Sequence, residues 1–459
     1  MRHLPSPACS STRLPKIALC VAAAFAAGTV SAQSAGVIPL RSLALGESRV
    51  EFYGVLDAGL ETLDNGGKRS TRLSSGISGG SRWGIRGTED LGGGYRTFFE
   101  LESRIELDNG TVQSSSPFVS SDLPVNTFAP GTPAGLIAAA TPTVIATQQS
   151  LQRLVTTVNR DNALFDRTAI VGMATPVGAI IAGRIYTPGY EIMNAYTVYG
   201  DATAGQIGQG YAAVTIRANN AVAYRVRFAE KLLISLMYSF GGNETLGFGR
   251  SERTTAPTKA DDYYGANIRW YTDTFDIGAG WNRNQTFKPS TNEAVKGLET
   301  LHFGSAYKMG AFRLYGEAMT RKNNNPLFEG LPTPATLAQF NAIQPFLSYQ
   351  DADLVVGRLG KTDTRVYSVS GGYWTGGGTV TLGYTRADDR RAENADVDHY
   401  SIGYFHEVSK RTTLYTDFAL ARNHNTARMA LGSAGFSGGF VDRTGDDSRV
   451  FQVGLRHVF

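Results

Sequence analysis

A serine in the segment Gly76-Ile77-Ser78-Gly79-Gly80 has the G-x-S-x-G spacing of a nucleophile elbow, which would activate the hydroxyl for acyl transfer. That motif requires a sharp turn from a strand into a helix, and a hairpin between strands does not supply one. Five histidines follow residue 32 and are spread over separate segments: His302, His399, His406, His424 and His457. No local Asp or Asn pattern favours a Ser-His pair. We therefore expect no enzyme.

Acidic residues are concentrated between positions 388 and 398, where Asp388, Asp389, Glu393, Asp396 and Asp398 supply carboxylates that a divalent cation could use. A solvated acidic face is the favoured interpretation. No His, Cys or Asp cluster has the spacing of a structural zinc site, and no glycine-rich loop links a strand to a helix as phosphate binding requires. The sequence thus predicts neither a metal nor a cofactor.

Residues 1–32 have the order of a secretory signal peptide, in which basic residues precede an apolar stretch and then small residues. The basic residues are Arg2, Arg13 and Lys16, the apolar stretch is 17–30, and Val30-Ser31-Ala32 offers a cleavage site. We expect an exported chain made of residues 33–459 as one domain.

Cys9 and Cys20 both lie inside this predicted signal, so the exported chain has no cysteine for a disulfide, a thiol nucleophile or a metal site. The exported part would carry 41 basic and 40 acidic residues, since the signal contains three of the 44 basic residues and none of the 40 acidic ones. A net charge of +1 gives no support for a nucleic-acid partner. No later segment approaches the ~20 apolar residues of a membrane-spanning helix.

From residue 50 onward, apolar and polar residues alternate with a period of two, as in strands that expose one face to each environment. In one example, Val222, Tyr224, Val226 and Phe228 oppose Arg225 and Arg227. The alternation continues to the C-terminal Phe459. It predicts an all-β fold.

The connections between these predicted strands fall into two sets. Seven are tight turns, at 90–94, 175–177, 229–231, 272–274, 308–311, 375–378 and 408–410. Eight are longer loops, at about 63–70, 109–165, 187–217, 242–259, 288–297, 323–363, 390–396 and 424–447. Alternation of the two sets predicts sixteen antiparallel strands closed into a barrel. Short turns on one side and long loops on the other are typical of outer-membrane barrels, which have no unpaired edge in lipid.

Several segments resemble one known family, the trimeric general diffusion porins of the Gram-negative outer membrane, of the beta-proteobacterial type. They are EFYGVLDAG at 51–59, SRWGIRGTEDLGGG at 81–94, FFELE at 98–102, GRIYTP at 183–188 and VGLRHVF at 453–459. The resemblance spans nearly all of residues 33–459. It implies passive diffusion of small hydrophilic solutes and ions through a homotrimer embedded in outer-membrane lipid and lipopolysaccharide.

The resemblance also implies a pore narrowed by the third external loop, which folds inward and corresponds to residues 187–217. Its carboxylates are Glu191 and Asp201, and the basic wall opposite would comprise Arg82, Arg104 and Arg184. Other charged residues with lumen-facing parity are Arg86, Glu100, Glu102, Arg225, Arg227, Arg269 and Arg313. Such opposed charges would set size exclusion and ion preference. Alternatively, the wall arginines and glutamates pair with one another for stability.

Two loops depart from the family pattern. The second external loop, 111–158, carries a Ser/Pro/Ala/Thr-rich insertion at 114–142 and then a possible helical region at 148–158. Three roles for this insertion stay open: it covers the pore, it extends over a neighbouring subunit, or it only adds to the external surface. The loop 323–363 is long and contains apolar residues, and folding over the pore mouth would narrow selectivity.

Two other functions stay open from sequence alone. A substrate-selective channel would have the same barrel with a binding ladder in the lumen, and its conductance would saturate. A surface adhesin or receptor would use the long loops, and deleting 114–158 would then abolish binding without altering conductance.

Overall fold

The computed structural model describes residues 48–116, 118–122, 131–159, 162–200, 202–206, 215–241, 262–288, 293–323, 362–392, 394–435 and 438–459. The predicted signal peptide, Asp201, Glu393 and nearly all of the loop 323–363 lie outside the described residues.

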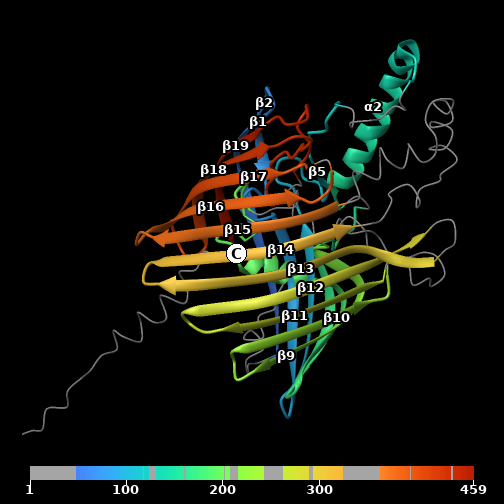
Figure 1. Ribbon diagram of the computed structural model, residues 1–459. Coiled ribbons are helices and arrows are strands. Elements are labelled where there is room, and N and C mark those ends of the chain that lie inside the picture. Colours follow the sequence, from blue (N-terminus) through green and yellow to red (C-terminus); the bar gives the residue numbers. More distant parts are fainter. Residues whose placement is uncertain are drawn as a thin grey trace, which may run out of the picture.

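One large antiparallel sheet forms the body of the protein (Figure 1). Its strands are β1 (Arg49–Asn65), β2 (Lys68–Ser75), β3 (Arg82–Gly92), β4 (Tyr95–Arg104), β7 (Thr168–Thr175), β8 (Gly178–Tyr186), β9 (Arg217–Phe228), β10 (Leu232–Ser239), β11 (Tyr263–Tyr271), β12 (Phe275–Lys288), β13 (Glu293–Met309), β14 (Phe312–Asn323), β15 (Thr362–Trp374), β16 (Gly378–Asp389), β17 (Val397–Glu407), β18 (Thr412–Asn423) and β19 (Ser448–Val458).

The sheet closes into a barrel because β1 pairs with β19, from Val55 opposite Val458 to Asn65 opposite Ser448. Although the sheet contains seventeen segments, β2 and β3 both pair with β1, along 58–65 and 49–55 respectively. They are two halves of one interrupted strand, so the barrel has the predicted sixteen strands. Closure satisfies the backbone hydrogen-bonding groups that an open edge would expose to lipid.

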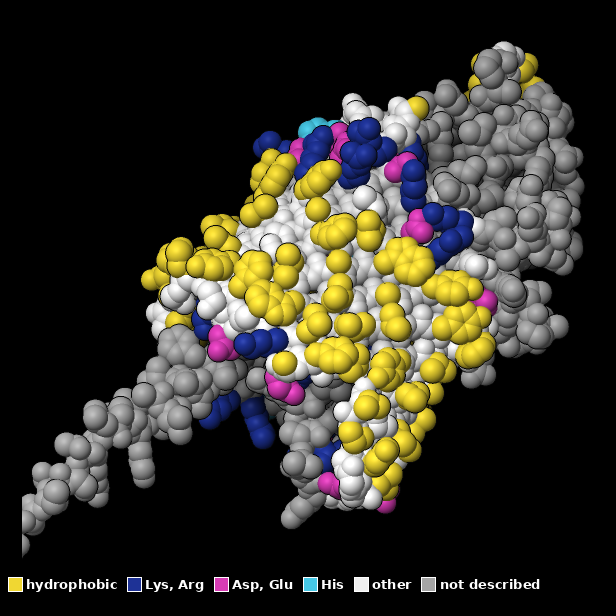
Figure 2. All heavy atoms as spheres, turned by 60° about the horizontal axis from the view of Figure 1, so that its bottom comes forward, with side chains coloured by type: hydrophobic (Ala, Val, Ile, Leu, Met, Phe, Trp, Pro, Cys, Tyr) yellow, Lys and Arg dark blue, Asp and Glu magenta, His cyan; other side chains and the backbone are white. Residues whose placement is uncertain are grey.

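The predicted alternation describes the two faces of the wall. On β9, Val222, Tyr224 and Phe228 are exposed on the outer surface, whereas Arg225 points inward and is 3% exposed. Apolar side chains gather in a band across the wall, and charged side chains lie along its margins (Figure 2). Lipid hydrocarbon solvates apolar side chains but offers no partner to a charged one, so this outer surface is suited to a membrane.

Tight turns lie at one end of the barrel, as predicted. They join β3 to β4, β7 to β8, β9 to β10, β11 to β12, β13 to β14, β15 to β16 and β17 to β18. At the other end two of the predicted loops are shorter than expected. The predicted loop 63–70 is a two-residue turn at Gly66 and Gly67, whose φ angles of 69° and 92° suit glycine. The loop 288–297 is also reduced, since β12 continues to Lys288 and β13 begins at Glu293.

In the part of the chain that the structure describes, two helices lie outside the sheet. Helix α2 (Ala134–Thr156) rises from the short ladder of β5 (Ser114–Ser115) with β6 (Thr157–Val158) and projects beyond the loop end of the barrel (Figure 1). It begins earlier than the predicted helical region 148–158, at Ala134, and continues through Pro142. Helix α3 (Pro188–Ala195) lies within the loop 187–217. Among the described residues, neither helix combines the length and hydrophobicity that crossing a membrane requires.

Candidate pore constriction

The loop 187–217, which we call L3, leaves β8 through a capped helix. Thr187 caps α3, since its side-chain oxygen accepts from the backbone N–H of Tyr190 at 3.4 Å. Pro188 suits the first helical turn, where a missing N–H costs nothing. The Thr187 N–H donates to the carbonyl of Ile216 at 3.0 Å, so the two ends of L3 are held together.

Helix α3 and Tyr196 lie against three glycines of the inner wall. On β12, a Cβ added at Gly278 would come 2.6 Å from the Tyr196 hydroxyl, and one at Gly280 would come 2.9 Å from Ile192. On β13, a Cβ at Gly304 would overlap the Tyr196 ring. The glycines therefore make the space that L3 occupies.

Polar contacts fix L3 along this path. Glu191 pairs with Arg225 of β9 and accepts from Asn267 of β11 at 2.9 Å. Further along, the Tyr196 hydroxyl donates to Asp276 of β12 at 2.7 Å. Near the tip, the N–H of Ala204 donates to Gln452 of β19 at 2.8 Å. The described parts of L3 thus contact inner-wall residues from β9 to β19.

The break between β2 and β3 receives the tip of L3. The carbonyl of Ile77 accepts from the Thr203 N–H at 2.7 Å. Asp57 of β1 supports the break, because its carboxylate accepts from the Ser78 N–H at 3.2 Å and from the Tyr415 hydroxyl at 2.7 Å. Ser78 lies in this bend between two strands, and its hydroxyl is buried. The segment has no helix after it, unlike a nucleophile elbow.

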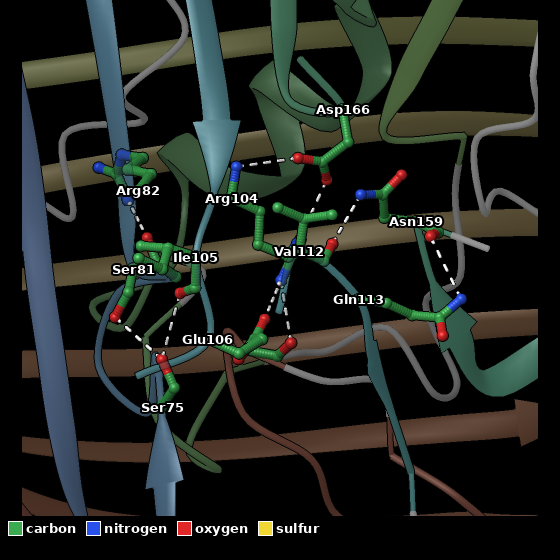
Figure 3. Close-up of polar contacts among 12 residues, drawn as sticks. Ser75, Ser81, Arg82, Arg104, Ile105, Glu106, Val112, Gln113, Asn159 and Asp166 are labelled. Carbon is green, nitrogen blue, oxygen red and sulfur yellow. Dashed lines mark hydrogen bonds and ion pairs between the residues drawn. The ribbon is translucent and has the colours of Figure 1, made fainter. Parts of the chain in front are cut away.

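Arg82 and Arg104 stand opposite each other on β3 and β4, and both are buried. The Arg82 Nε lies 3.2 Å from Glu102, and its guanidinium donates to the carbonyl of Gly80 at 2.7 Å. Arg104 contacts Asp166 at 3.2 Å and Glu106 at 3.3 Å (Figure 3). Two of the three predicted wall arginines, Arg82 and Arg104, are therefore ion-paired.

Arg184 of β8 belongs to the same group. Its Nε donates to the carbonyl of Asp166 at 2.5 Å, and its guanidinium also contacts Asn219. Arg167 contacts Glu102 at 2.7 Å, and both Arg167 and Arg217 donate to the Tyr186 hydroxyl. We define the arginine cluster as Arg82, Arg104, Arg167, Arg184 and Arg217 with the carboxylates Glu102, Glu106 and Asp166.

The arginine cluster controls the ionisation of Asp166, which lies in the loop before β7. Burial alone would raise the pKa of this carboxyl, but the charges of Arg104, Arg217, Arg167 and Arg184 outweigh burial and lower the pKa below its ordinary value. Asp166 therefore stays ionised in the neutral range. With five arginines and three carboxylates, the arginine cluster carries two excess positive charges when all its groups are ionised.

The other predicted lumen residues lie in different surroundings. Arg86 contacts Glu51 at 2.8 Å toward the tight-turn end, where both side chains are partly exposed. Glu100 is buried beside Glu102. Arg227 pairs with Glu230 at 3.3 Å and Arg269 with Asp276, while Arg313 covers the ring of Tyr315. The structure joins Glu191 to Arg225 rather than to Arg82 or Arg104.

Strand parity did not identify Glu106, Asp166, Arg167 and Arg217 as members of this group. Glu106, Asp166 and Arg167 lie in loop residues, and Arg217 opens β9. The sequence did contain a clue. These four residues are at or near strand ends on the loop side of the barrel, where Arg104 and Arg184 also lie. Ends of neighbouring antiparallel strands meet at the same rim of a barrel.

Parts of two external loops contact each other at this rim. The Phe440 N–H donates to the carbonyl of Phe118 at 3.1 Å, and the Thr444 N–H donates to Asp122 at 2.9 Å. Gly435 of the same loop, 424–447, accepts from Arg104 at 2.9 Å. This loop therefore reaches from the second external loop down to the arginine cluster.

The described acidic residues between 388 and 398 are engaged by arginines. Asp389 pairs with Arg391 at 2.8 Å, and Arg386 contacts Asp396 at 2.5 Å and Asp398 at 2.8 Å. Within the described part of the chain, no group of three or more His, Cys, Asp and Glu side chains is arranged to hold a metal ion.

Comparison with known proteins places this barrel in a family. Residues 18–426 match the model of the Gram-negative porin family. The chain is 24% identical over 441 residues to outer membrane porin protein 32 of Delftia acidovorans, covering 92% of this chain and 97% of the relative. It is 23% identical over 407 residues to an outer membrane porin protein of Bordetella pertussis, covering 82% and 90% respectively.

Solved porin structures share the fold. The anion-selective porin from Comamonas acidovorans superposes with a TM-score of 0.61 at 22% identity, covering 90% of this chain and all of that one. The trimer form of OmpT, an outer membrane protein of Vibrio cholerae, superposes with a TM-score of 0.55 at 14% identity and the same coverage. With a closed barrel, an apolar outer band and a match over most of its length, the chain belongs to the Gram-negative porin family and is a diffusion channel integral to the outer membrane.

Proposed function

We propose that this porin has a charged constriction between L3 and the arginine cluster, and that it prefers anions. One observation carries the proposal. Helix α3 and Tyr196 of L3 rest on glycines of β12 and β13, while Arg82 and Arg104 of the arginine cluster extend from β3 and β4. Solutes entering from outside would pass between the two.

The charges in this passage support an anion preference. The arginine cluster has an excess of two positive charges, and Glu191 of L3 is neutralised by Arg225. A net positive wall lowers the energy of an anion in the constriction and raises the energy of a cation there. The similar porin from Comamonas acidovorans is anion-selective. Asp201, the second carboxylate predicted for L3, lies outside the described residues.

The pairs within the arginine cluster have a second role. An unpaired buried charge costs several kcal/mol, so Glu102 and Asp166 stabilise the arginines that they contact. Ion pairing within the arginine cluster does not remove its electrostatic effect on the pore, because five arginines and three carboxylates still leave a surplus of positive charge. The proposal therefore includes both interpretations of the wall arginines.

We further propose that the working unit is a homotrimer whose outer band contacts lipid and whose external margin contacts lipopolysaccharide. The trimer form of OmpT supports the first part. The second is supported by Arg422, which extends from the outer face of β18 over the ring of Tyr400. Cations beside an aromatic margin suit anionic headgroups. Crosslinking of the purified protein, with the band size compared before and after heating, tests the trimer.

Transport, with no catalysis, is the proposed activity of the chain. Reversal potential in planar bilayers under a tenfold KCl gradient tests the constriction directly. The proposal predicts an anion-selective potential that falls when charge is removed from the arginine cluster. A cation-selective potential in the unaltered protein would contradict it.

A further inference from the structure

A cavity of about 220 Å³ lies at the tight-turn end of the barrel, away from the arginine cluster. Its lining comes from the ends of β3, β4, β7, β8 and β9 and includes Arg96, Arg225 and Arg227. These arginines have lumen-facing parity, so the cavity opens inside the barrel wall. Nothing in the diffusion mechanism requires a pocket there.

Strand register explains how the cavity forms. Arg96 of β4 pairs with Ala174 of β7, Ala174 with Ala179 of β8, and Ala179 with Arg225 of β9. Two small residues thus separate two arginines along one row across the sheet. Three strand spacings put the Cα atoms of Arg96 and Arg225 roughly 14 Å apart. Arg225 is engaged by Glu191, but Arg227 lies two residues further along β9 on the same face, so the side chains of Arg96 and Arg227 can reach toward each other over the alanines.

The arginines at the cavity are rich in donors for a ligand. Arg96 and Arg225 are 6% and 3% exposed. Among the described residues, the buried Nε–H groups of Arg225 and Arg227 have no acceptor. A guanidinium has five N–H donors, and one carboxylate accepts at most two in a fork.

The acidic partners at the cavity are weakly held. Asp90 contacts Arg96 at 3.4 Å and Glu230 contacts Arg227 at 3.3 Å, while the Asp90 and Glu230 side chains are 36% and 73% exposed. The arginines are largely buried, but both contacts are long and both carboxylates are open to water, which weakens the attraction. An arriving anion can therefore replace these carboxylates, which return to water at small cost.

We propose that this cavity is a binding site for a small multivalent oxyanion, such as phosphate or a dicarboxylate, at the periplasmic end of the pore. The bound oxyanion accepts from Arg227 and Arg96 above the floor of Ala174 and Ala179. This inference goes beyond diffusion through the constriction, because it predicts a saturable step for one class of solute. Monovalent chloride lacks the several oxygens that would bridge two guanidinium groups.

Single-channel conductance in potassium phosphate at pH 8, measured from low to high concentration beside potassium chloride, tests this site. The expected result is saturation in phosphate and a linear rise in chloride. Arg227→Gln and Arg96→Gln should each raise the half-saturating phosphate concentration about three- to tenfold, since each removes charge-assisted hydrogen bonds. Conductance in chloride also shows that each variant forms a pore, so failure of the site is distinguishable from failure of the channel.

Lys231→Gln is the matched control. Lys231 lies in the same turn as Glu230 and carries the same charge as Arg227, but it does not line the cavity. Its phosphate curve should match that of the unaltered protein. A linear phosphate curve in the unaltered protein would overturn the proposal, as would an equal effect of Lys231→Gln and Arg227→Gln, which would indicate a diffuse field without a site.

Discussion

Arg82 and Arg104 are register partners on adjacent strands, and each is held by a different carboxylate: Glu102 for Arg82 and Asp166 for Arg104. Like charges placed directly opposite in a sheet repel each other. Their partners come from β4 and from the loop before β7, so the pair depends on contacts between separate segments. This relationship connects the stability of the external rim to the charge of the pore.

Removing either arginine should weaken the preference for anions. A unit charge about 8 Å from the ion path changes the energy of an ion by about 0.5 kcal/mol in water. The change has opposite signs for an anion and a cation, so we expect the anion-to-cation permeability ratio to fall roughly fivefold in Arg82→Gln or Arg104→Gln. Reversal potential under a KCl gradient measures this ratio. Arg411→Gln, in the exposed turn before β18, should leave the ratio unchanged. An equal fall in that control would indicate a general surface-charge effect.

A side chain at Gly304 should displace L3. The Cβ of Gly304→Ala would overlap the Tyr196 ring, and overpacking of this kind costs about 1–3 kcal/mol. We expect altered single-channel conductance with more frequent closures, and a lower temperature for the heat-induced gel shift. The comparison is Gly316→Ala on β14, where the nearest side-chain and backbone atoms lie 4.0 Å from the added Cβ. If both variants behave like the unaltered protein, L3 does not depend on this seat.

Acid should loosen the rim through Asp166. The folded-state pKa of this carboxyl is lowered, so its stabilising contribution is fully present above the pKa of the unfolded chain, whose ordinary value is 3.8. The contribution is lost as the pH falls below that value through the lower folded-state pKa. Protease resistance of the external loops should therefore drop more steeply below about pH 4 in the unaltered protein than in Asp166→Asn. Parallel pH profiles for the two proteins would exclude this role for Asp166.

Helix α2 should be dispensable for conduction, because it projects beyond the barrel (Figure 1). Replacing residues 131–152 with a short Gly/Ser linker retains β5, β6 and the contacts of Phe118 and Asp122 with the loop 424–447. We expect unchanged single-channel conductance and unchanged ion preference. A large rise in conductance would show that the segment covers the pore mouth. Loss of cell-surface binding with normal conductance would instead support the adhesin function.

The barrel itself was predictable from sequence, since the alternation of Val222, Tyr224 and Phe228 with Arg225 and Arg227 fixes which side of a strand meets lipid. The two-residue turn at Gly66 and Gly67 was missed because polar residues continue the strands beyond the membrane, where apolar alternation ends. The strand interruption at 76–81 was also missed, although three glycines among these six residues are a turn signal.

The contacts of the charged side chains could not be predicted in the same way. Parity placed Arg82, Arg104 and Arg225 inside the barrel, but the partner of Arg104 is 62 residues away and lies in a loop. The pairing of Glu191 with Arg225 depends on where L3 lies, which is set by wall glycines on β12 and β13. Such contacts are determined by three-dimensional register rather than by local pattern.

The central claim is an anion-preferring diffusion pore constricted by L3, and single-channel recording of the purified protein under a KCl gradient tests it most directly. The account predicts an ohmic conductance and channels that close in three steps. The reversal potential should have the sign of an anion-selective pore. Cation selectivity, or a folded barrel that carries no current, would contradict it.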